Sequence, residues 1–213
     1  MRPAAGSLVF LIVTLSLQAQ EAAPPPSIRA TIIEVSGQRA LPIPINGQAV
    51  GFALQKPEQQ VAIAARLGNG GGHAYLDAYL TRRIGPGTTE ADEIAHTSFD
   101  LQYPNDEWVM LFEDLDLDKG VYWLIVAKPH DRAFSSLNWF VANPQELTGS
   151  CGAIRYLGTK SYTFFGDAAE YIPASKFEPK YESSYGFQFL VTAARTAADE
   201  CTSRIIFARG SSE

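Results

Sequence analysis

The chain contains 213 residues, of which 46% are hydrophobic and 19% are charged, and its formal net charge is −6. This length suits one domain with a substantial hydrophobic core. The acidic balance argues against a nucleic-acid partner, because binding to a phosphate backbone depends on clustered Lys and Arg.

The N-terminal segment 1–19 has the pattern of a cleavable secretory signal peptide. Arg2 supplies a short positive region, and Leu8–Leu17 is an uncharged apolar run. A permanent membrane span takes about 20 apolar residues, and neither this run nor any later one reaches that length. Cleavage is expected after Ala19 or a few residues later, and the loss of Arg2 changes the net charge from −6 to −7. We therefore expect a secreted or periplasmic protein with no membrane span in the mature chain.

The mature chain is expected to begin with a Pro-rich leader, residues 20–27, which its consecutive prolines hold extended. Residues 28–213 are then expected to form a single β-sandwich domain. A first strand is predicted to start at Ile28, where apolar residues begin to alternate, and the alternation returns at residues 50–54.

Residues 61–81 carry the pattern of a β-hairpin. Side chains alternate with period two over 61–67 and again over 74–81, and the Gly-rich segment Gly68–Gly72 separates the two stretches. Such a pattern is typical of antiparallel neighbours joined by a loop. The alanines also admit a helix over 58–67, and this alternative stays open.

The middle of the chain predicts more strands. The acidic stretch 88–93 is expected to be a loop or one helical turn, 94–101 a strand, and 108–112 another. The run Val121–Ala127 is apolar on both faces, which predicts a central strand covered on each side.

The C-terminal part is less regular. A strand is expected over 137–141 and an irregular excursion over 145–184, before alternation returns at 185–191 and a last strand follows at 203–208. Many short strands at turn-marked intervals, without long amphipathic helices, indicate an all-β fold. The predicted architecture is an antiparallel two-sheet sandwich of jelly-roll-like form.

Cys151 and Cys201 are the only cysteines in the chain. Export would place them in an oxidising compartment, so we predict a disulfide between them. Closing a loop of about 50 residues would stabilise the fold by about 4 kcal/mol. The alternative is two unrelated buried thiols. A metal site is not expected, because neither cysteine has a neighbouring Cys or His at ligand spacing.

Alternating aspartates at Asp114, Asp116 and Asp118 resemble the acidic half of a calcium-binding loop, where carboxylates supply oxygen ligands. A complete loop of this kind has Gly at its sixth position and a carboxylate at its twelfth, whereas this chain has Lys119 and Ile125 there. The alternative is an amphipathic strand with an acidic edge, and it explains the same residues without Ca²⁺.

No motif assembles a catalytic set. The segment Gly68–Gly72 lacks the Lys-Ser/Thr ending of a phosphate-binding loop and is better explained as a hairpin loop. His73, His96 and His130 are scattered, and the chain has no Gly-x-Ser-x-Gly nucleophile elbow. Catalytic residues are therefore not assigned.

Aromatic residues offer the best candidates for ligand contact, because flat rings bury a large apolar area with fixed geometry and can stack on sugars. Trp123 lies on the doubly apolar run and is expected in the core. The candidate binding residues are Trp139, Tyr79, Tyr103 and Trp108. Of these, Trp139 and Tyr79 are expected at the surface.

The stretch 52–141 contains a set of strand and turn residues: Gly71–Leu76, Tyr79–Thr81, Ile84–Thr88, Phe112, Leu115, Leu117, Gly120–Leu124 and Trp139. In these residues it resembles a group of exported bacterial domains found in choice-of-anchor and sorting-signal surface proteins, most of them uncharacterised. The resemblance covers less than half of the chain and implies a jelly-roll sandwich with an extracellular role and no assigned activity.

These observations favour a secreted, non-enzymatic β-sandwich module that binds a glycan or a surface protein. Two alternatives remain open at this point. One is an extracellular hydrolase, and the other is a passive structural component of an envelope or matrix.

Overall fold

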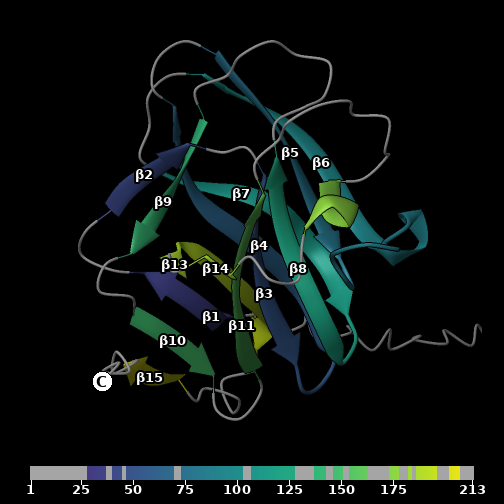
Figure 1. Cartoon of the computed structure of the whole chain (residues 1–213). Coiled ribbons are helices and arrows are strands. Elements are labelled where there is room, and N and C mark those ends of the chain that lie inside the picture. Colours follow the sequence, from purple (N-terminus) through teal and green to yellow (C-terminus); the bar gives the residue numbers. More distant parts are fainter. Residues whose placement is uncertain are drawn as a thin grey trace, which may run out of the picture.

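A computed structural model describes residues 28–36, 40–44, 47–69, 73–102, 107–127, 137–142, 146–150, 154–162, 173–177, 182–183, 186–195 and 202–206. Within these ranges the chain is almost entirely extended, and two antiparallel sheets pack against each other (Figure 1). The predicted all-β sandwich is therefore confirmed.

Sheet A contains nine strands in the described part of the chain, in the order β13-β9-β4-β14-β1-β10-β15, with β2 paired to β9 and β7 paired to β4. Its strands are β1 (Ile28–Ser36), β2 (Ala40–Pro44), β4 (Glu58–Asn69), β7 (Glu107–Leu117), β9 (Leu137–Ala142), β10 (Glu146–Ser150), β13 (Gly186–Phe187), β14 (Phe189–Arg195) and β15 (Thr202–Ile206).

Sheet B has the order β12-β11-β3-β8-β5-β6. Its strands are β3 (Gly47–Leu54), β5 (His73–Thr81), β6 (Glu93–Gln102), β8 (Gly120–Ala127), β11 (Ile154–Tyr162) and β12 (Glu182–Ser183). Among the described residues, two short 3₁₀ helices accompany the strands, η1 (Glu90–Asp92) and η2 (Pro173–Lys176). The single turn η1 lies in the acidic stretch for which a loop or one helical turn was expected.

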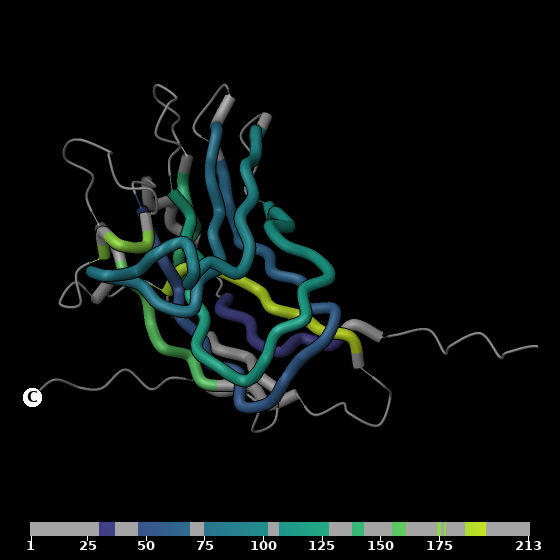
Figure 2. The backbone as a smooth tube through the Cα atoms, turned by 90° about the vertical axis from the view of Figure 1, so that its right-hand side faces the viewer, coloured from purple at the N-terminus to yellow at the C-terminus, as the bar shows by residue number. Residues whose placement is uncertain are grey.

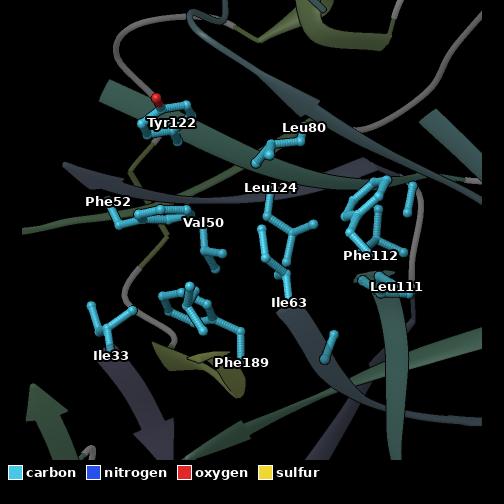
Figure 3. Packing of buried hydrophobic residues seen from close by; sticks show 14 of the residues in the cluster. Ile33, Val50, Phe52, Ile63, Leu80, Leu111, Phe112, Tyr122, Leu124 and Phe189 are labelled. Carbon is cyan, nitrogen blue, oxygen red and sulfur yellow. The ribbon is translucent and has the colours of Figure 1, made fainter. Parts of the chain in front are cut away.

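The main core lies between the sheets, where alternate side chains of the facing strands meet (Figure 3). Phe52 packs against Tyr122 and Phe189, with ring centroids 5.6 and 6.2 Å apart. Each large apolar side chain that is fully buried in this way contributes about 1.5–3 kcal/mol. The sandwich is therefore stabilised chiefly by the burial of the apolar side chains that alternate along its strands.

Strand β8 is central and covered on both faces, as its apolar run predicts. It lies between β3 and β5 in sheet B and contributes Tyr122 and Leu124 to the main core. On the other face, Ile125 packs with Ala174 and Phe177 of the η2 segment in a second, smaller cluster. Figure 1 shows η2 lying over this face of sheet B.

The predicted hairpin over 61–81 is wrong, although both of its strands exist. Strand β4 belongs to sheet A, where it pairs with β7, β14 and β9, and β5 belongs to sheet B, where it pairs with β6 and β8. Ile63 and Leu80 both point into the main core, but from opposite sheets. The connection therefore crosses from one layer to the other, and the helical alternative for 58–67 is also wrong.

The structure also corrects the expected irregular excursion over 145–184, which contains β10, β11, η2 and β12. Strand β11 escaped detection because its alternation is interrupted. Its register against β3 shifts between Tyr156 and Gly158, and Gly158 adopts φ +90°. A bulge of this kind inserts one residue and changes the phase of the side-chain pattern.

Candidate binding surface

Strand β7 exposes two large apolar side chains on the outer face of sheet A. Trp108 is 41% exposed and Met110 is 43% exposed. They are two residues apart on a strand and therefore share one face, while the intervening Val109 packs against the main core. Adjacent exposed apolar residues of this kind mark an interaction site more often than single ones do.

Arg66 and Phe140 extend this surface across the sheet. Arg66 on β4 is the register partner of Trp108 and lies between the core residues Ala65 and Leu67, so it points outward. Its guanidinium carbon lies 5.7 Å from the centroid of the Phe140 ring, which also lies on the outer face. We name Trp108, Met110, Arg66 and Phe140 together the Trp108 strip.

Gln188 holds the strip in place where the chain passes from β13 to β14. Its backbone N–H donates to the carbonyl of Phe140 at 2.9 Å, and its carbonyl accepts from the N–H of Arg66 at 3.1 Å. Its side-chain Oε1 accepts from Nη1 of Arg66 at 3.1 Å. Gln188 thus joins β9 to β4 through both its backbone and its side chain, and this fixes Arg66 beside Phe140.

A buried alanine separates longer side chains on the neighbouring part of the same face. Met110 lies opposite Ala64 of β4, and Ala64 lies opposite Leu190 of β14. Ala64 is only 4% exposed, so Trp108 and Met110 are the large exposed apolar side chains of this face.

The structure places the four predicted binding residues differently. Trp139 is fully buried, because its indole N–H donates to the carbonyl of Gln188 at 2.8 Å and its ring packs on Phe187 at 4.9 Å. The expectation that Trp139 lies at the surface is therefore wrong. Tyr103 lies outside the described residues. Trp108 alone among the four is described and well exposed.

The expectation that Tyr79 lies at the surface is also wrong. Only 7% of this residue is exposed. Its ring stacks on His96, with centroids 4.2 Å apart and planes within 6°. It belongs to the smaller cluster beneath η2. Tyr79 therefore supports the outer face of sheet B and leaves its neighbour His96 as the exposed ring.

The three aspartates proposed for calcium do not form a common site in the structure. Asp116 Oδ1 accepts from the backbone N–H of Gln60 at 3.2 Å, and Asp118 Oδ2 lies 4.0 Å from Nη2 of Arg82. No group of three or more His, Cys, Asp or Glu side chains in the described ranges is arranged to hold a metal ion. Leu117 enters the core from the same strand as Asp114 and Asp116, as the amphipathic-strand alternative expects.

Cys151 and Cys201 lie outside the described residues, so the structure does not test the predicted disulfide. The strands next to them are described, and they pair in antiparallel register with Ser150 opposite Thr202.

A polar cluster that the sequence did not reveal lies on β5 and β6 of sheet B. Ser98 donates its hydroxyl proton to Asp77 Oδ1 at 2.6 Å, and His96 Nε2 lies 3.8 Å from the same oxygen. A nucleophilic triad needs the histidine between the hydroxyl and the carboxylate, whereas here the carboxylate lies between the other two. The pairing of β5 with β6 brings these residues together, and no local spacing signals it.

The chain matches no protein-family model, no curated protein and no solved structure. The resemblance of residues 52–141 to exported surface-protein domains therefore stays a prediction. Within the described ranges, no helix is long and apolar enough to cross a membrane.

Proposed function

We propose that this protein is a secreted, non-enzymatic module that binds a glycan on the Trp108 strip. The observation that carries the proposal is the exposure of Trp108 on the outer face of sheet A. A large aromatic ring in water is unfavourable, and a sugar ring stacked on it would remove apolar surface of both from solvent.

The surroundings of Trp108 support this function. The register partner Arg66 carries a guanidinium whose fixed, planar N–H groups suit sugar hydroxyl oxygens at the edge of a stacked ring. Its hydrogen bond to Gln188 and its contact with Phe140 hold it in place. A preorganised surface loses less side-chain entropy when the ligand binds.

The test is a polysaccharide and glycan-array screen of the secreted product and of its Trp108→Ala variant. We expect Trp108→Ala to weaken binding at least about tenfold, which corresponds to about 1.4 kcal/mol. Val121→Ala is the matched control, because Val121 is 42% exposed but lies on β8 of sheet B. Equal losses in both variants, or ligand binding that Trp108→Ala leaves intact, would contradict the proposal.

A second candidate, recognition of a surface protein, is favoured by the position of Met110 on the same strand. In the described part of the chain β7 pairs only with β4 and forms an edge of sheet A, and Met is enriched with Trp at protein interfaces. A protein would cover both side chains, so Met110→Ala and Trp108→Ala would weaken its binding alike. A stacked sugar depends mainly on Trp108, and this difference separates the two candidates.

A further inference from the structure

All the charged residues of β7, the strand that carries Trp108, are acidic. Strand β7 contains four acidic residues and no basic one, and all four acids are exposed: Glu107, Glu113, Asp114 and Asp116. They flank Trp108 and Met110 on both sides along the strand. Any ligand that lies along β7 from the Trp108 ring therefore meets carboxylates.

We infer that the glycan bound on the Trp108 strip is a polymer of amino sugars with free, protonated amino groups. This inference rests on the proposed function and adds the chemical class of the ligand. Carboxylates at the solvent-exposed edge attract ammonium groups and repel uronate or sulfate groups. The face of the Trp108 ring itself also attracts a cation held within about 6 Å.

The basic residues near β7 do not reverse this preference. Arg66 lies across from Trp108 on β4, where it is engaged with Gln188 and Phe140. Arg82 lies beside Asp118, just beyond the end of β7. The four carboxylates of β7 therefore dominate the charge along the strand, while a single fixed guanidinium lies across from the stacking residue.

The distance along the strand points to a polymer and not to a single sugar. Trp108 lies opposite Arg66 and Leu115 lies opposite Val61, with two register shifts between these pairs. Asp116 therefore lies about six strand steps, roughly 20 Å, from Trp108. One stacked sugar would cover only the Trp108 end. A chain of sugars lying along β7 would bring successive amino groups past the exposed Glu113 and Asp116.

Protection of a sheet edge from aggregation is the competing explanation for the acids, because edge strands commonly carry charge. That explanation accounts for Glu113, Asp114 and Asp116 but not for the exposed Trp108 and Met110, which make an edge more adhesive. A ligand that uses both an aromatic platform and carboxylates accounts for the whole strand.

The test compares two hexamers of identical length and linkage, β-1,4-linked glucosamine and its fully N-acetylated form, by calorimetry in slightly acidic buffer. We expect the amino form to bind the secreted product about tenfold or more tightly at low salt. Raising the salt from about 0.05 to 0.5 M should remove most of that preference, because exposed charges are then screened. Trp108→Ala should weaken the binding of both hexamers.

The charge variants complete the design. Glu113→Gln/Asp114→Asn/Asp116→Asn should lower the affinity for the amino hexamer about tenfold and leave the affinity for the acetylated hexamer unchanged. Glu90→Gln is the control for losing an exposed carboxylate outside β7, because Glu90 is exposed and lies on η1. Circular dichroism and thermal unfolding of each variant separate loss of binding from loss of fold.

The outcomes distinguish the two levels of the proposal. Equal, Trp108-dependent binding of the two hexamers would overturn the inferred charge preference and leave glycan binding intact. Binding of the amino hexamer that ignores Trp108→Ala would show unspecific attraction and overturn the inference. If Trp108→Ala changes binding to no glycan in the wider screen, the proposed function itself fails.

Discussion

Trp123 of β8 lies directly over Gly51 of β3, its register partner in sheet B. A Cβ atom added to Gly51 would lie 2.7 Å from Cζ3 of the indole, closer than real side chains come. The absence of a side chain at position 51 therefore allows Trp123 to lie across the sheet and to pack against the small cluster beneath η2.

Gly51→Ala is expected to lower the free energy of unfolding by about 1–3 kcal/mol, because the added methyl group must displace the indole or the strand. Urea unfolding measures the change. Trp123→Leu in the same background should recover part of the loss, since the clash partner is removed. Strictly additive effects of the two substitutions would show that they do not interact and would contradict this contact.

We expect Tyr122 to make the free energy of unfolding depend on pH in the alkaline range. Burial raises the pKa of its hydroxyl, and Asp118 adds to the increase, while Arg82 opposes it. The hydroxyl also donates to the carbonyl of Asp118 at 2.6 Å. The protonated form is therefore favoured in the folded state.

The sign of the effect follows from this preference. Below the ordinary tyrosine pKa of about 10 both states hold the proton and the contribution is fully present. Above that pH the unfolded state loses the proton first, so stability falls as the pH rises through the higher folded-state pKa. Tyr122→Phe should remove this part of the decline above about pH 10, as measured by denaturant unfolding at each pH. An unchanged alkaline slope would show that other groups cause it.

The strands of the sandwich were largely predictable, but their partners were not. Alternation shows which face of a strand is buried, and this was correct for the inward residues of β4 and β5 such as Ile63 and Leu80. It does not show which strand lies alongside. The Gly-rich segment therefore suggested pairing between β4 and β5, whereas the two strands lie in opposite sheets.

The candidate binding surface was predictable only in residue type. In the segment 138–141 the bulky Trp139, Phe140 and Val141 follow one another, and local pattern does not decide whether Trp139 or Phe140 points inward. The choice depends on Gln188, 49 residues further along the chain, whose carbonyl accepts the indole N–H of Trp139. Trp108 becomes exposed because its neighbour Val109 takes the inward position on β7.

Gln60 holds an unfavourable backbone conformation at an irregular point in the pairing of β4 with β7. Its φ is +50°, which is uncommon for a residue with a side chain, and the register shifts between Glu58 and Val61. Gln60→Gly is expected to raise the free energy of unfolding by up to about 1 kcal/mol, because glycine adopts positive φ without steric cost. Its backbone N–H still donates to Asp116 in the variant.

Gln59→Gly is the matched control for Gln60→Gly, since Gln59 is an exposed neighbour without positive φ. It should destabilise the strand by roughly 0.5–1 kcal/mol, because glycine gains chain freedom in the unfolded state. Thermal unfolding of the two variants should therefore shift in opposite directions. Shifts in the same direction would show that the conformation of Gln60 carries no strain.

The register of β10 with β15 sharpens the predicted disulfide. Ser150 lies opposite Thr202 in an antiparallel pair, and Cys151 and Cys201 are the residues next to this pair in the sequence. Facing residues of antiparallel strands have Cα atoms about 4.5–5.5 Å apart, within the range that a disulfide spans. Independent of any export signal, the strand pairing thus favours a bond within one chain.

Peptide mass mapping of the purified protein without reduction should recover Cys151 and Cys201 in one linked pair. Reduction, or the variant Cys151→Ser/Cys201→Ser, should lower the free energy of unfolding by about 4 kcal/mol, because the open chain regains the entropy of a loop of about 50 residues. Two titratable thiols per folded chain would contradict the prediction. A covalent dimer on a non-reducing gel would contradict it as well, since the predicted bond lies within one molecule.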